Sequence, residues 1–259
     1  MSAPSLYNLI LNASNGEHDM SSMRLVIVGG SAASTTTTHR ILDFFPNADL
    51  CSAYGATESG IPAVLYPEDQ RRKEMCAGVP PLGVELKILD DDGVECAPNQ
   101  VGTIYSRGWH TGVEYYKNPA ATAAAFRGEF HTVEDMGYLD EDGYLFITDR
   151  RKNMILSSGI NVFPTEIENV LVSHPDVVEA AVIGIPDETW GELVCAFVVL
   201  RAGVDANSSS LDAHCRERLA RYKVPRRYEF VPDLPRTHAG KLAHRELRAP
   251  FWADRSAQS

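Results

Sequence analysis

A near-continuous apolar run closed by two glycines, MRLVIVGG at residues 23–30, constrains the fold more than any other stretch. The run lacks the alternation of a half-exposed strand, so it predicts a buried strand followed by a tight turn, as in α/β proteins. The next residues, STTTTHRILDFFPN, predict a helix that Ser34 or Thr35 caps and Pro46 ends. The four threonines do not predict a phosphate loop, because converging glycines and a following lysine are both missing.

Residues 51–60, CSAYGATESG, carry a candidate nucleotide site. A second short strand, ADLCSAYG, is expected to place Tyr54 to Glu58 just past its end. Ligands in open α/β sheets bind at the carboxyl ends of strands. An aromatic ring can stack on a base, a hydroxyl can contact a phosphate, and a carboxylate can bind a metal ion. Taken alone, the same residues equally suit a polar turn.

From residue 78 onward, alternating apolar and polar residues around Asp-Gly turns predict an antiparallel β region. A short alanine-rich helix is expected after Pro119. The charged run DRRKN predicts a domain boundary, and the strand and helix patterns beyond it indicate a compact α+β domain. One of its helices, SSSLDAHCRERLARY, is expected to carry a serine cap.

The predicted fold is therefore an α/β region with a small barrel-like β region, followed by a separate α+β C-terminal domain. The expected divisions are residues 1–66 for the α/β part, 67–148 for the β part, 149–152 for a hinge, and 153–259 for the C-terminal domain.

Composition excludes several classes of function. A formal charge of −11 over 259 residues leaves no basic face for nucleic acid. The five cysteines show no CxxC spacing and the eight histidines no HExxH pattern, so neither a disulfide framework nor a zinc site is supported. No apolar stretch reaches ~18 residues and the start lacks a basic signal region, so we expect no membrane span and a cytoplasmic location.

Six motifs stand in order along the chain: YGATE (54–58), VGTIYSRG (101–108), TVEDMGYLDEDGYLFITDRRKNMI (132–155), GINVFPTEIE (159–168), YKVP (222–225) and PRTHAGK (235–241). Together they resemble the second half of the adenylate-forming enzymes, the superfamily of acyl-CoA synthetases, luciferases and peptide-synthetase adenylation domains. The resemblance implies a two-step reaction. A carboxylic acid attacks the α-phosphate of ATP to give an acyl-adenylate and pyrophosphate, and a thiol, usually that of coenzyme A, then displaces AMP.

The resemblance gives the YGATE residues distinct roles. Tyr54 matches the residue that stacks on adenine, and an aromatic face offers apolar contact to a flat base. Gly55 belongs to the same motif, and Thr57 matches a hydroxyl that contacts phosphate. Glu58 matches the carboxylate that serves Mg²⁺, a hard cation with oxygen ligands. The turn after the first strand matches a wall of the adenine and acyl pocket, although the family's usual proline is missing from it; its residues are Gly30, Ser31 and Ala32.

The ribose side follows from the third motif. Asp135 matches the aspartate that accepts hydrogen bonds from both ribose hydroxyls, and Arg150 matches an arginine that also contacts the ribose. Glu134 stands where the family has glycine, so its charge either repels the triphosphate or points to solvent. Without the family context, Arg150 also suits a solvated basic turn.

The C-terminal domain carries the remaining implied roles. Lys152 matches the hinge about which this domain rotates between the two half-reactions. Ser157, Ser158 and Gly159 match a turn that approaches the pantetheine arm of coenzyme A, with Ser158 in place of a glycine. Lys241 matches the catalytic lysine, whose ammonium would stabilise charge that develops on the α-phosphate.

The family's Ser/Thr/Gly-rich phosphate loop and most of its acyl pocket are not found in these residues. Because members of the family are about twice as long, the resemblance implies a truncated chain, in which the α/β part is the remnant of a larger N-terminal subdomain. One hypothesis is an acyl-CoA synthetase, weakly active or inactive alone, whose first half was lost or comes from another chain. The alternative is a non-catalytic remnant that acts as a binding module. A peptide-synthetase domain is less favoured, because no carrier-protein region follows.

The acyl substrate is not readable from the motifs. A fatty acid is the expectation that the family provides, and the small Ala56 hints at a roomy pocket. An uncovered sheet edge would make residues 1–140 poorly soluble or self-associating, which leaves a homo-oligomer open. Residues 153–250 are expected to fold independently.

Overall fold

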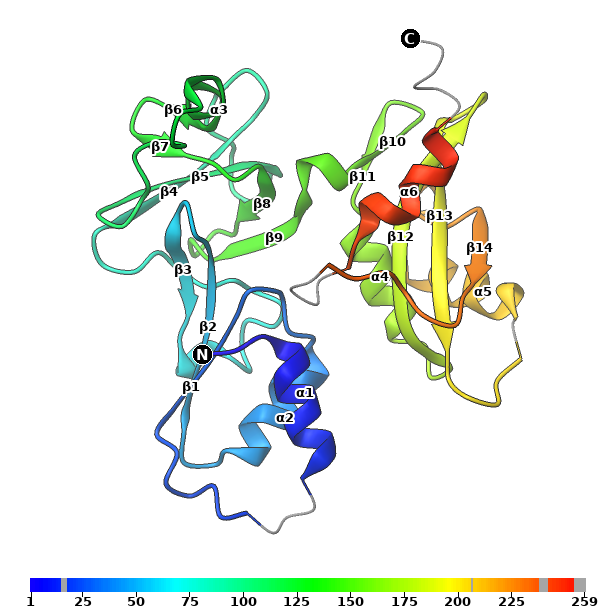
Figure 1. Cartoon of the computed structure of the whole chain (residues 1–259), viewed down its shortest axis with the longest axis horizontal. Helices are drawn as coiled ribbons and strands as arrows, with labels where there is room; N and C mark the ends of the chain where they lie inside the picture. The colour runs from blue at the N-terminus through cyan, green and yellow to red at the C-terminus, as the bar shows by residue number, and fades with distance from the viewer. Residues whose placement is uncertain (15–17, 206, 238–241, 254–259) are drawn as a thin grey trace. The chain divides into compact units, whose positions relative to one another are not determined.

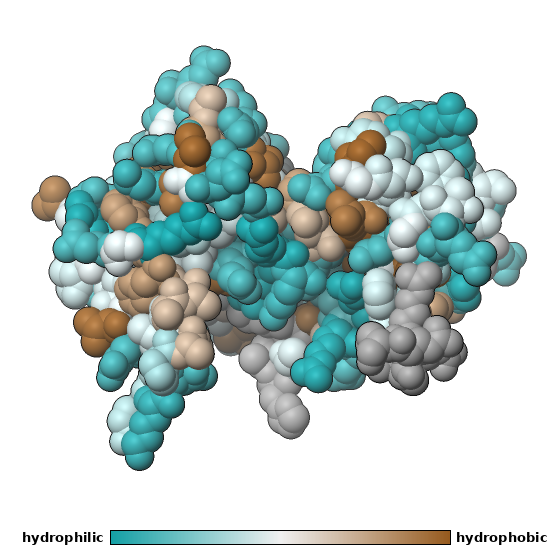
Figure 2. Space-filling model, turned by 90° about the horizontal axis from the view of Figure 1, so that it is seen from above, coloured by the Kyte–Doolittle hydropathy of each residue, from teal (hydrophilic) through white to brown (hydrophobic). Residues whose placement is uncertain are grey.

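The computed structural model describes residues 1–14, 18–205, 207–237 and 242–253. The chain forms two compact units, Met1–Thr148 and Asp149–Ser259 (Figure 1). Polar residues cover most of the face seen in Figure 2, and apolar residues lie among them in small groups. Within the described ranges, every helix is too short or too polar to cross a membrane.

The first unit begins with a three-stranded sheet of order β1-β2-β3, in which β1 and β2 are parallel and β2 and β3 antiparallel. Helices α1 and α2 lie side by side against it (Figure 1). Ser34 caps α2 through its hydroxyl, which accepts from the Thr37 amide at 3.2 Å, as predicted. The elements are α1 (Pro4–Ala13), β1 (Leu25–Gly29), α2 (Thr35–Phe44), β2 (Asp49–Ala56) and β3 (Gly60–Leu65).

Strand β1 has one well-packed face. Val26 and Val28 are buried with Tyr7, Ile41 and other apolar residues of the two helices. Leu25, on the opposite face, is 53% exposed. The predicted burial of the strand therefore holds for Val26, Val28 and Gly29, whereas Leu25 at the start of the strand is largely exposed. Helix α1 was not predicted, since ten residues with one short apolar run carry little periodic signal.

Strand β2 extends further than predicted. Tyr54 lies within the strand, which ends at Ala56, and only Thr57 to Ser59 form the turn that follows. The reason is β3, an unpredicted partner that pairs with β2 up to the Ala56–Gly60 position and so extends the strand to Ala56. The expectation that Tyr54 follows the strand was wrong.

The rest of the first unit is a six-stranded sheet of order β6-β7-β5-β8-β9, with β4 also paired to β5. Both predicted Asp-Gly turns are present, since Gly93 and Gly143 have φ near +80° and each donates its amide three residues back. The predicted alanine-rich helix is α3, capped by Asn118. The elements are η1 (Pro67–Asp69), β4 (Val84–Leu89), β5 (Gly102–Gly108), α3 (Pro119–Ala125), β6 (Phe126–Arg127), β7 (Phe130–His131), β8 (Asp135–Leu139) and β9 (Leu145–Arg150).

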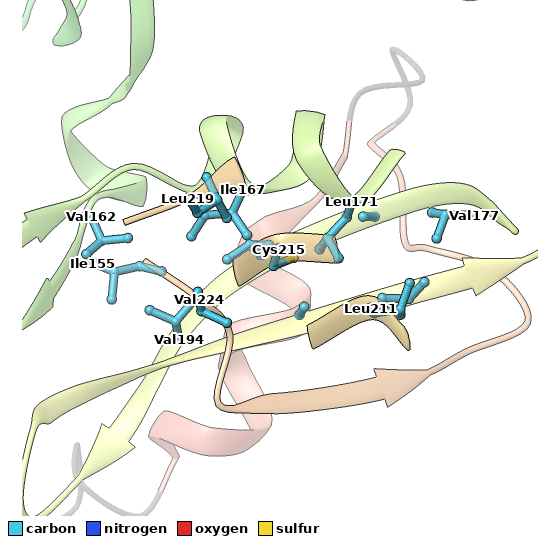
Figure 3. Packing of buried hydrophobic residues seen from close by; sticks show 14 residues of the cluster. Ile155, Val162, Ile167, Leu171, Val177, Val194, Leu211, Cys215, Leu219 and Val224 are labelled. Carbon is cyan, nitrogen blue, oxygen red and sulfur yellow. The ribbon is translucent and has the colours of Figure 1, made fainter. Parts of the chain in front are cut away.

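The second unit is a five-stranded sheet of order β11-β10-β13-β12, with β14 also paired to β13. Successive residues of β12 and β13 face opposite sides. Ala180, Val182 and their neighbours pack with α4 and α5 (Figure 3), whereas Ala181 and Ile183 pack on the side of α6. The elements are η2 (Arg151–Asn153), β10 (Ile155–Ser157), β11 (Ile160–Val162), α4 (Pro164–Val172), β12 (Val177–Asp187), β13 (Gly191–Leu200), α5 (Ser208–Arg218), β14 (Arg227–Phe230) and α6 (His244–Trp252).

The cap of α5 differs from the prediction. Asn207, not a serine, precedes the helix, and its side-chain oxygen accepts from the Ser210 amide at 3.1 Å. Asparagine and serine are both strong N-cap residues, so the sequence of four consecutive capping residues did not decide between them. The fold class itself is confirmed: an α/β unit with an antiparallel sheet, and a separate α+β C-terminal domain.

Candidate functional site

Tyr54 and Asp135 contact each other directly. The Tyr54 hydroxyl in β2 donates to Asp135 Oδ2 at 2.8 Å, although the two residues are 81 positions apart. Asp135 is the first residue of β8 and is buried, whereas the Tyr54 ring is half-buried against the core of the β region. The structure thus brings together the two residues predicted for adenine and ribose, one from each sheet of the first unit.

Thr57 and Glu58 lie on the turn between β2 and β3. The turn is fixed by its backbone: the Ala56 amide donates to Ser59 Oγ at 3.2 Å, and the Gly112 amide donates to the Glu58 carbonyl at 2.7 Å. The Thr57 side chain is exposed and that of Glu58 is half-exposed. Both groups can therefore meet a ligand without rearranging the backbone.

Gly55 has a packing reason to be glycine. A Cβ at this position would lie 1.9 Å from the Gly60 carbonyl oxygen across the hairpin. Gly30, after β1, has φ of +83°, a left-handed conformation that favours glycine. Ser31 and Ala32 follow it and are exposed. These small residues keep the chain close to the strand ends.

Three buried polar atoms near this hairpin have no hydrogen-bond partner among the described residues: His110 Nδ1, Thr111 Oγ1 and His131 Nδ1. His131 is only 2% exposed. Burial lowers the pKa of His131, and the charge of Glu58 partly offsets this. Buried polar groups are rarely left unsatisfied, so these atoms suit water or phosphate oxygens. Sequence reasoning missed all three residues, because none of them lies in a quoted motif; His131 directly precedes the motif that begins at Thr132.

The Glu58 carboxylate is compatible with Mg²⁺. Burial, then the charges of Glu58 and Glu134, raises the pKa of Tyr115, so acidic charge gathers in this region. In the part of the chain that the structure describes, no three His, Cys, Asp or Glu side chains converge as a metal site. A cation at Glu58 would thus complete its shell with water and phosphate oxygens, as Mg²⁺ does in nucleotide sites.

Glu134, the residue before Asp135, has φ of +62°. Its amide donates to Thr132 Oγ1 at 2.9 Å and its side chain is exposed. The left-handed backbone explains why a glycine would suit this position.

In the second unit, Arg150 ends β9 with an exposed side chain, and Lys152 is exposed within η2. Asp149, which was not singled out from the sequence, is buried beside them. Its carboxylate accepts from the Arg150 amide at 2.6 Å and from the Thr165 amide at 3.0 Å, at the start of α4. This set of hydrogen bonds to the Asp149 carboxylate has no local sequence signal, because Thr165 is 16 residues away.

Ser157, Ser158 and Gly159 close the hairpin between β10 and β11. Ser157 pairs with Ile160, which leaves a two-residue loop with φ of +51° at Ser158 and +77° at Gly159. Positive φ at both loop residues is typical of a type I′ turn. The Ser158 amide donates to the Trp190 carbonyl at 2.8 Å.

Lys241, the predicted catalytic lysine, lies outside the described residues. The described segments on either side of Lys241 pair with each other. Arg236 forms an antiparallel β-bridge with Leu242, and the Ala243 amide donates to the Pro235 carbonyl at 2.9 Å. His244 then begins α6, with Nε2 2.8 Å from Glu168 Oε1 of α4. The predicted residues thus fall into two groups: the base, phosphate and metal residues with Asp135 in the first unit, and Arg150, Lys152 and the Ser157–Gly159 turn in the second.

Comparisons with known proteins find a family match in each of the two units. The family model described as AMP-binding enzyme matches residues 1–116, and that described as AMP-binding enzyme C-terminal domain matches residues 166–241. The 2-succinylbenzoate–CoA ligase of Geobacillus kaustophilus is 48% identical over 196 residues, 75% of this chain and 40% of that protein. The fatty acid–[acyl-carrier-protein] ligase ScoC of Streptomyces coeruleorubidus is 41% identical over 244 residues, 92% of this chain and 47% of that protein.

Among solved structures, the o-succinylbenzoate coenzyme A synthetase (MenE) from Bacillus subtilis, in complex with ATP and magnesium ion, has a TM-score of 0.84 at 33% identity. The match covers 95% of this chain and 50% of that chain. This chain spans about half the length of the curated relatives it matches. Both of its units are accounted for, and the chain belongs to the AMP-binding, adenylate-forming enzyme family.

Proposed function

We propose that this chain carries the nucleoside-binding and C-terminal parts of an AMP-forming acid–thiol ligase. The observation that supports this most is the 2.8 Å hydrogen bond between Tyr54 and Asp135, the residues expected to bind adenine and ribose. A nucleoside needs an apolar face and a hydroxyl acceptor side by side, and this pair provides both. The relatives are acid–CoA and acid–carrier-protein ligases by name, which supports the same class of reaction.

In this proposal the first unit binds ATP and the carboxylic acid. Tyr54 holds the base, Asp135 accepts from the ribose hydroxyls, and Thr57 contacts phosphate. Glu58, together with phosphate oxygens, would hold Mg²⁺, which would neutralise charge on the triphosphate. Gly30, Ser31 and Ala32 form a wall of the adenine and acyl pocket. The carboxylate displaces pyrophosphate to give the acyl-adenylate.

The second unit completes the reaction. Arg150 contributes to ribose binding and Lys241 stabilises charge on the α-phosphate in the first step. Rotation about a hinge at Lys152 then brings the Ser157–Gly159 turn to the pantetheine arm of coenzyme A, whose thiolate displaces AMP. The division of the first unit at residue 66, and the hinge at 149–152, stay part of the proposal.

For the acyl substrate we propose a hydrophobic carboxylic acid, a fatty acid being the simplest choice. Two of the relatives differ in the acid for which they are named: one is named for 2-succinylbenzoate and the other for fatty acids. The thiol could likewise belong to coenzyme A or to a carrier protein, because both present the same pantetheine arm. Competition between free coenzyme A and pantetheinylated carrier protein would separate the two.

Calorimetric titration with a non-hydrolysable acyl-adenylate analogue tests the proposal without requiring turnover. We expect binding that weakens about ten-fold or more in Tyr54→Ala, because the apolar contact with the base and the hydrogen bond to Asp135 are both lost. Tyr116→Ala is the matched control, since Tyr116 is 81% exposed and has no predicted role. Equal affinity in wild type and Tyr54→Ala would refute the assignment.

Turnover is a separate question. These 259 residues hold no Ser/Thr/Gly-rich loop ending near a lysine, so we expect weak carboxylate-dependent ATP–pyrophosphate exchange by the purified chain. Robust exchange that is abolished in Lys241→Ala would overturn this expectation and would make the chain catalytically competent by itself.

A further inference from the structure

The segment that follows Asp149, residues 150–153, is tied to the second unit by the Asp149 side chain. Its carboxylate accepts four hydrogen bonds: from the Arg150 amide at 2.6 Å, Asn153 Nδ2 at 3.1 Å, and both the amide and the hydroxyl of Thr165 at 3.0 Å. The bond from the Thr165 amide satisfies one of the free backbone N–H groups in the first turn of α4. A single buried carboxylate therefore links the segment to a helix of the unit core.

A second tie comes from α6. Arg248 Nη1 donates to the Lys152 carbonyl at 3.2 Å, across 96 positions of sequence. The same guanidinium lies 3.8 Å from Glu192 Oε1 and 5.1 Å from the centre of the Trp252 ring. Arg248 thus connects the segment to β13 through Glu192 and to its own helix through Trp252.

The Glu192 carboxylate is held tightly against the sheet. A Cβ on Gly184 would lie 1.9 Å from Glu192 Oε2, so the carboxylate occupies space that only a glycine leaves open. Burial raises the pKa of Glu192, although the nearby Arg248 opposes this. Helix α6 is anchored beside it, because Trp252 Nε1 donates to the Gly184 carbonyl at 3.1 Å. The contacts of Glu192 and Trp252 therefore hold the Arg248 guanidinium in place beside the Lys152 carbonyl.

We propose that Asp149 and Arg248 are positioning residues that fix residues 150–153 to the C-terminal unit, so that the segment pivots only after both ties are released. The Lys152 side chain is exposed. The contacts that hold the backbone around Lys152 are therefore those of Asp149 and Arg248. The proposed attachment of residues 150–153 to the C-terminal unit rests only on the contacts of Asp149 and Arg248. Its meaning as control of a catalytic hinge rests on the function proposed above.

Limited proteolysis with trypsin tests the tethering, because Arg150, Arg151 and Lys152 are consecutive cleavage sites. Arg248→Gln removes the charged donor to the Lys152 carbonyl, and Asp149→Asn replaces an acceptor by a group that is partly a donor. Losing a hydrogen bond to a charged group shifts a local opening equilibrium by about ten-fold, and cleavage that follows opening rises equally. Arg245→Gln is the control, since Arg245 is exposed on the same helix.

Mass analysis of the products separates local release from unfolding. We expect faster cleavage at 150–152 in both variants, with the rate at Arg216 and Arg218 of α5 unchanged. Arg248→Lys, which keeps a donor, is expected to restore part of the protection. Cleavage at 150–152 equal to that of Arg245→Gln would overturn the proposal, as would a parallel increase at α5. Neither readout needs bound nucleotide, so a failure of the proposed ligase function leaves this test intact.

Discussion

Glu134 and Ser158 are two of the five described non-glycine residues that have positive φ. Both have positive φ, +62° and +51°, and both stand where the family resemblance implied glycine. A left-handed conformation costs an L-residue about 1–2 kcal/mol. Ser158 lies in a two-residue hairpin loop and Glu134 immediately before the predicted ribose carboxylate, so the strain sits beside both candidate binding elements.

Ser158→Gly is expected to stabilise the second unit. Relief of the left-handed strain exceeds the entropy that glycine adds to the unfolded chain, for a net gain of up to ~1 kcal/mol. Urea denaturation followed by far-UV circular dichroism measures the change. Ser157→Gly is the control, because Ser157 lies in β10 and should lose about 0.5–1 kcal/mol. A loss of stability in Ser158→Gly would contradict this account.

His244 makes the stability of the second unit depend on pH. Burial lowers its pKa, but the hydrogen bond and the charge of Glu168 together outweigh burial, so the net pKa is raised. A group with a raised folded pKa stabilises the fold fully below its unfolded pKa of about 6.5 and loses this contribution as pH rises through the folded pKa.

We therefore expect the difference in unfolding free energy between wild type and Glu168→Gln to shrink as pH rises above about 6.5. Taking the difference removes the opposite trend of His214, whose pKa is lowered, chiefly by burial. The measurement is chemical denaturation at a series of pH values. A difference that does not vary with pH would show that the Glu168–His244 contact carries no net proton linkage.

At the scale of elements, hydrogen bonds hold the turn between β8 and β9 against the loop after η1. Lys73 Nζ donates to Asp140 at 2.6 Å and to Asp142 at 2.9 Å, and the hydrogen bond to Asp140 is the main cause of its raised pKa. The Tyr144 hydroxyl donates to Asp69 of η1 at 2.6 Å. These contacts join segments that are about 70 residues apart and help to place β8, which carries Asp135.

Lys73→Met is expected to lower the thermal unfolding midpoint of the first unit, because it leaves the mostly buried Asp140 carboxylate without its counter-ion. Arg71→Met is the matched control: its partner Asp43 is 73% exposed, and exposed pairs contribute little. Differential scanning calorimetry gives both midpoints. Equal shifts in the two variants would argue against a specific role for the Lys73 contacts.

At the scale of the whole molecule, the two units differ in how well they cover their apolar surface. The second unit packs both faces of its sheet with helices or chain segments. In the first unit, Leu9 of α1 is 65% exposed and Leu25 of β1 is 53% exposed. Large exposed apolar side chains on a surface that lacks full cover favour association.

Expressed separately, residues 149–259 are expected to unfold cooperatively in urea as a monomer, whereas residues 1–148 should associate. Size-exclusion chromatography with light scattering measures the association, and Leu9→Lys in the first unit should reduce it. A C-terminal piece that shows no cooperative transition, or that trypsin degrades without a stable fragment, would contradict the prediction that this domain folds by itself.

The sequence determined the elements whose signals are local. Apolar runs and alternation predicted β1 and most strands of both later sheets, though not β6 or β7. Asp-Gly pairs predicted two turns, and the order of six motifs indicated the family. It did not decide α1, the β3 partner that lengthens β2, or Asn207 as a cap, because each depends on which neighbour a segment finds.

The candidate site divides in the same way. The residues expected for base, ribose, phosphate and metal were named from the resemblance of the ordered motifs to the family. Only the tertiary structure decided that Tyr54 bonds Asp135, that Asp149 caps α4, and that Arg248 reaches Lys152. The physical reason is that hydrogen bonds across 16 to 96 positions arise from packing of whole elements, which local propensity and periodicity do not encode.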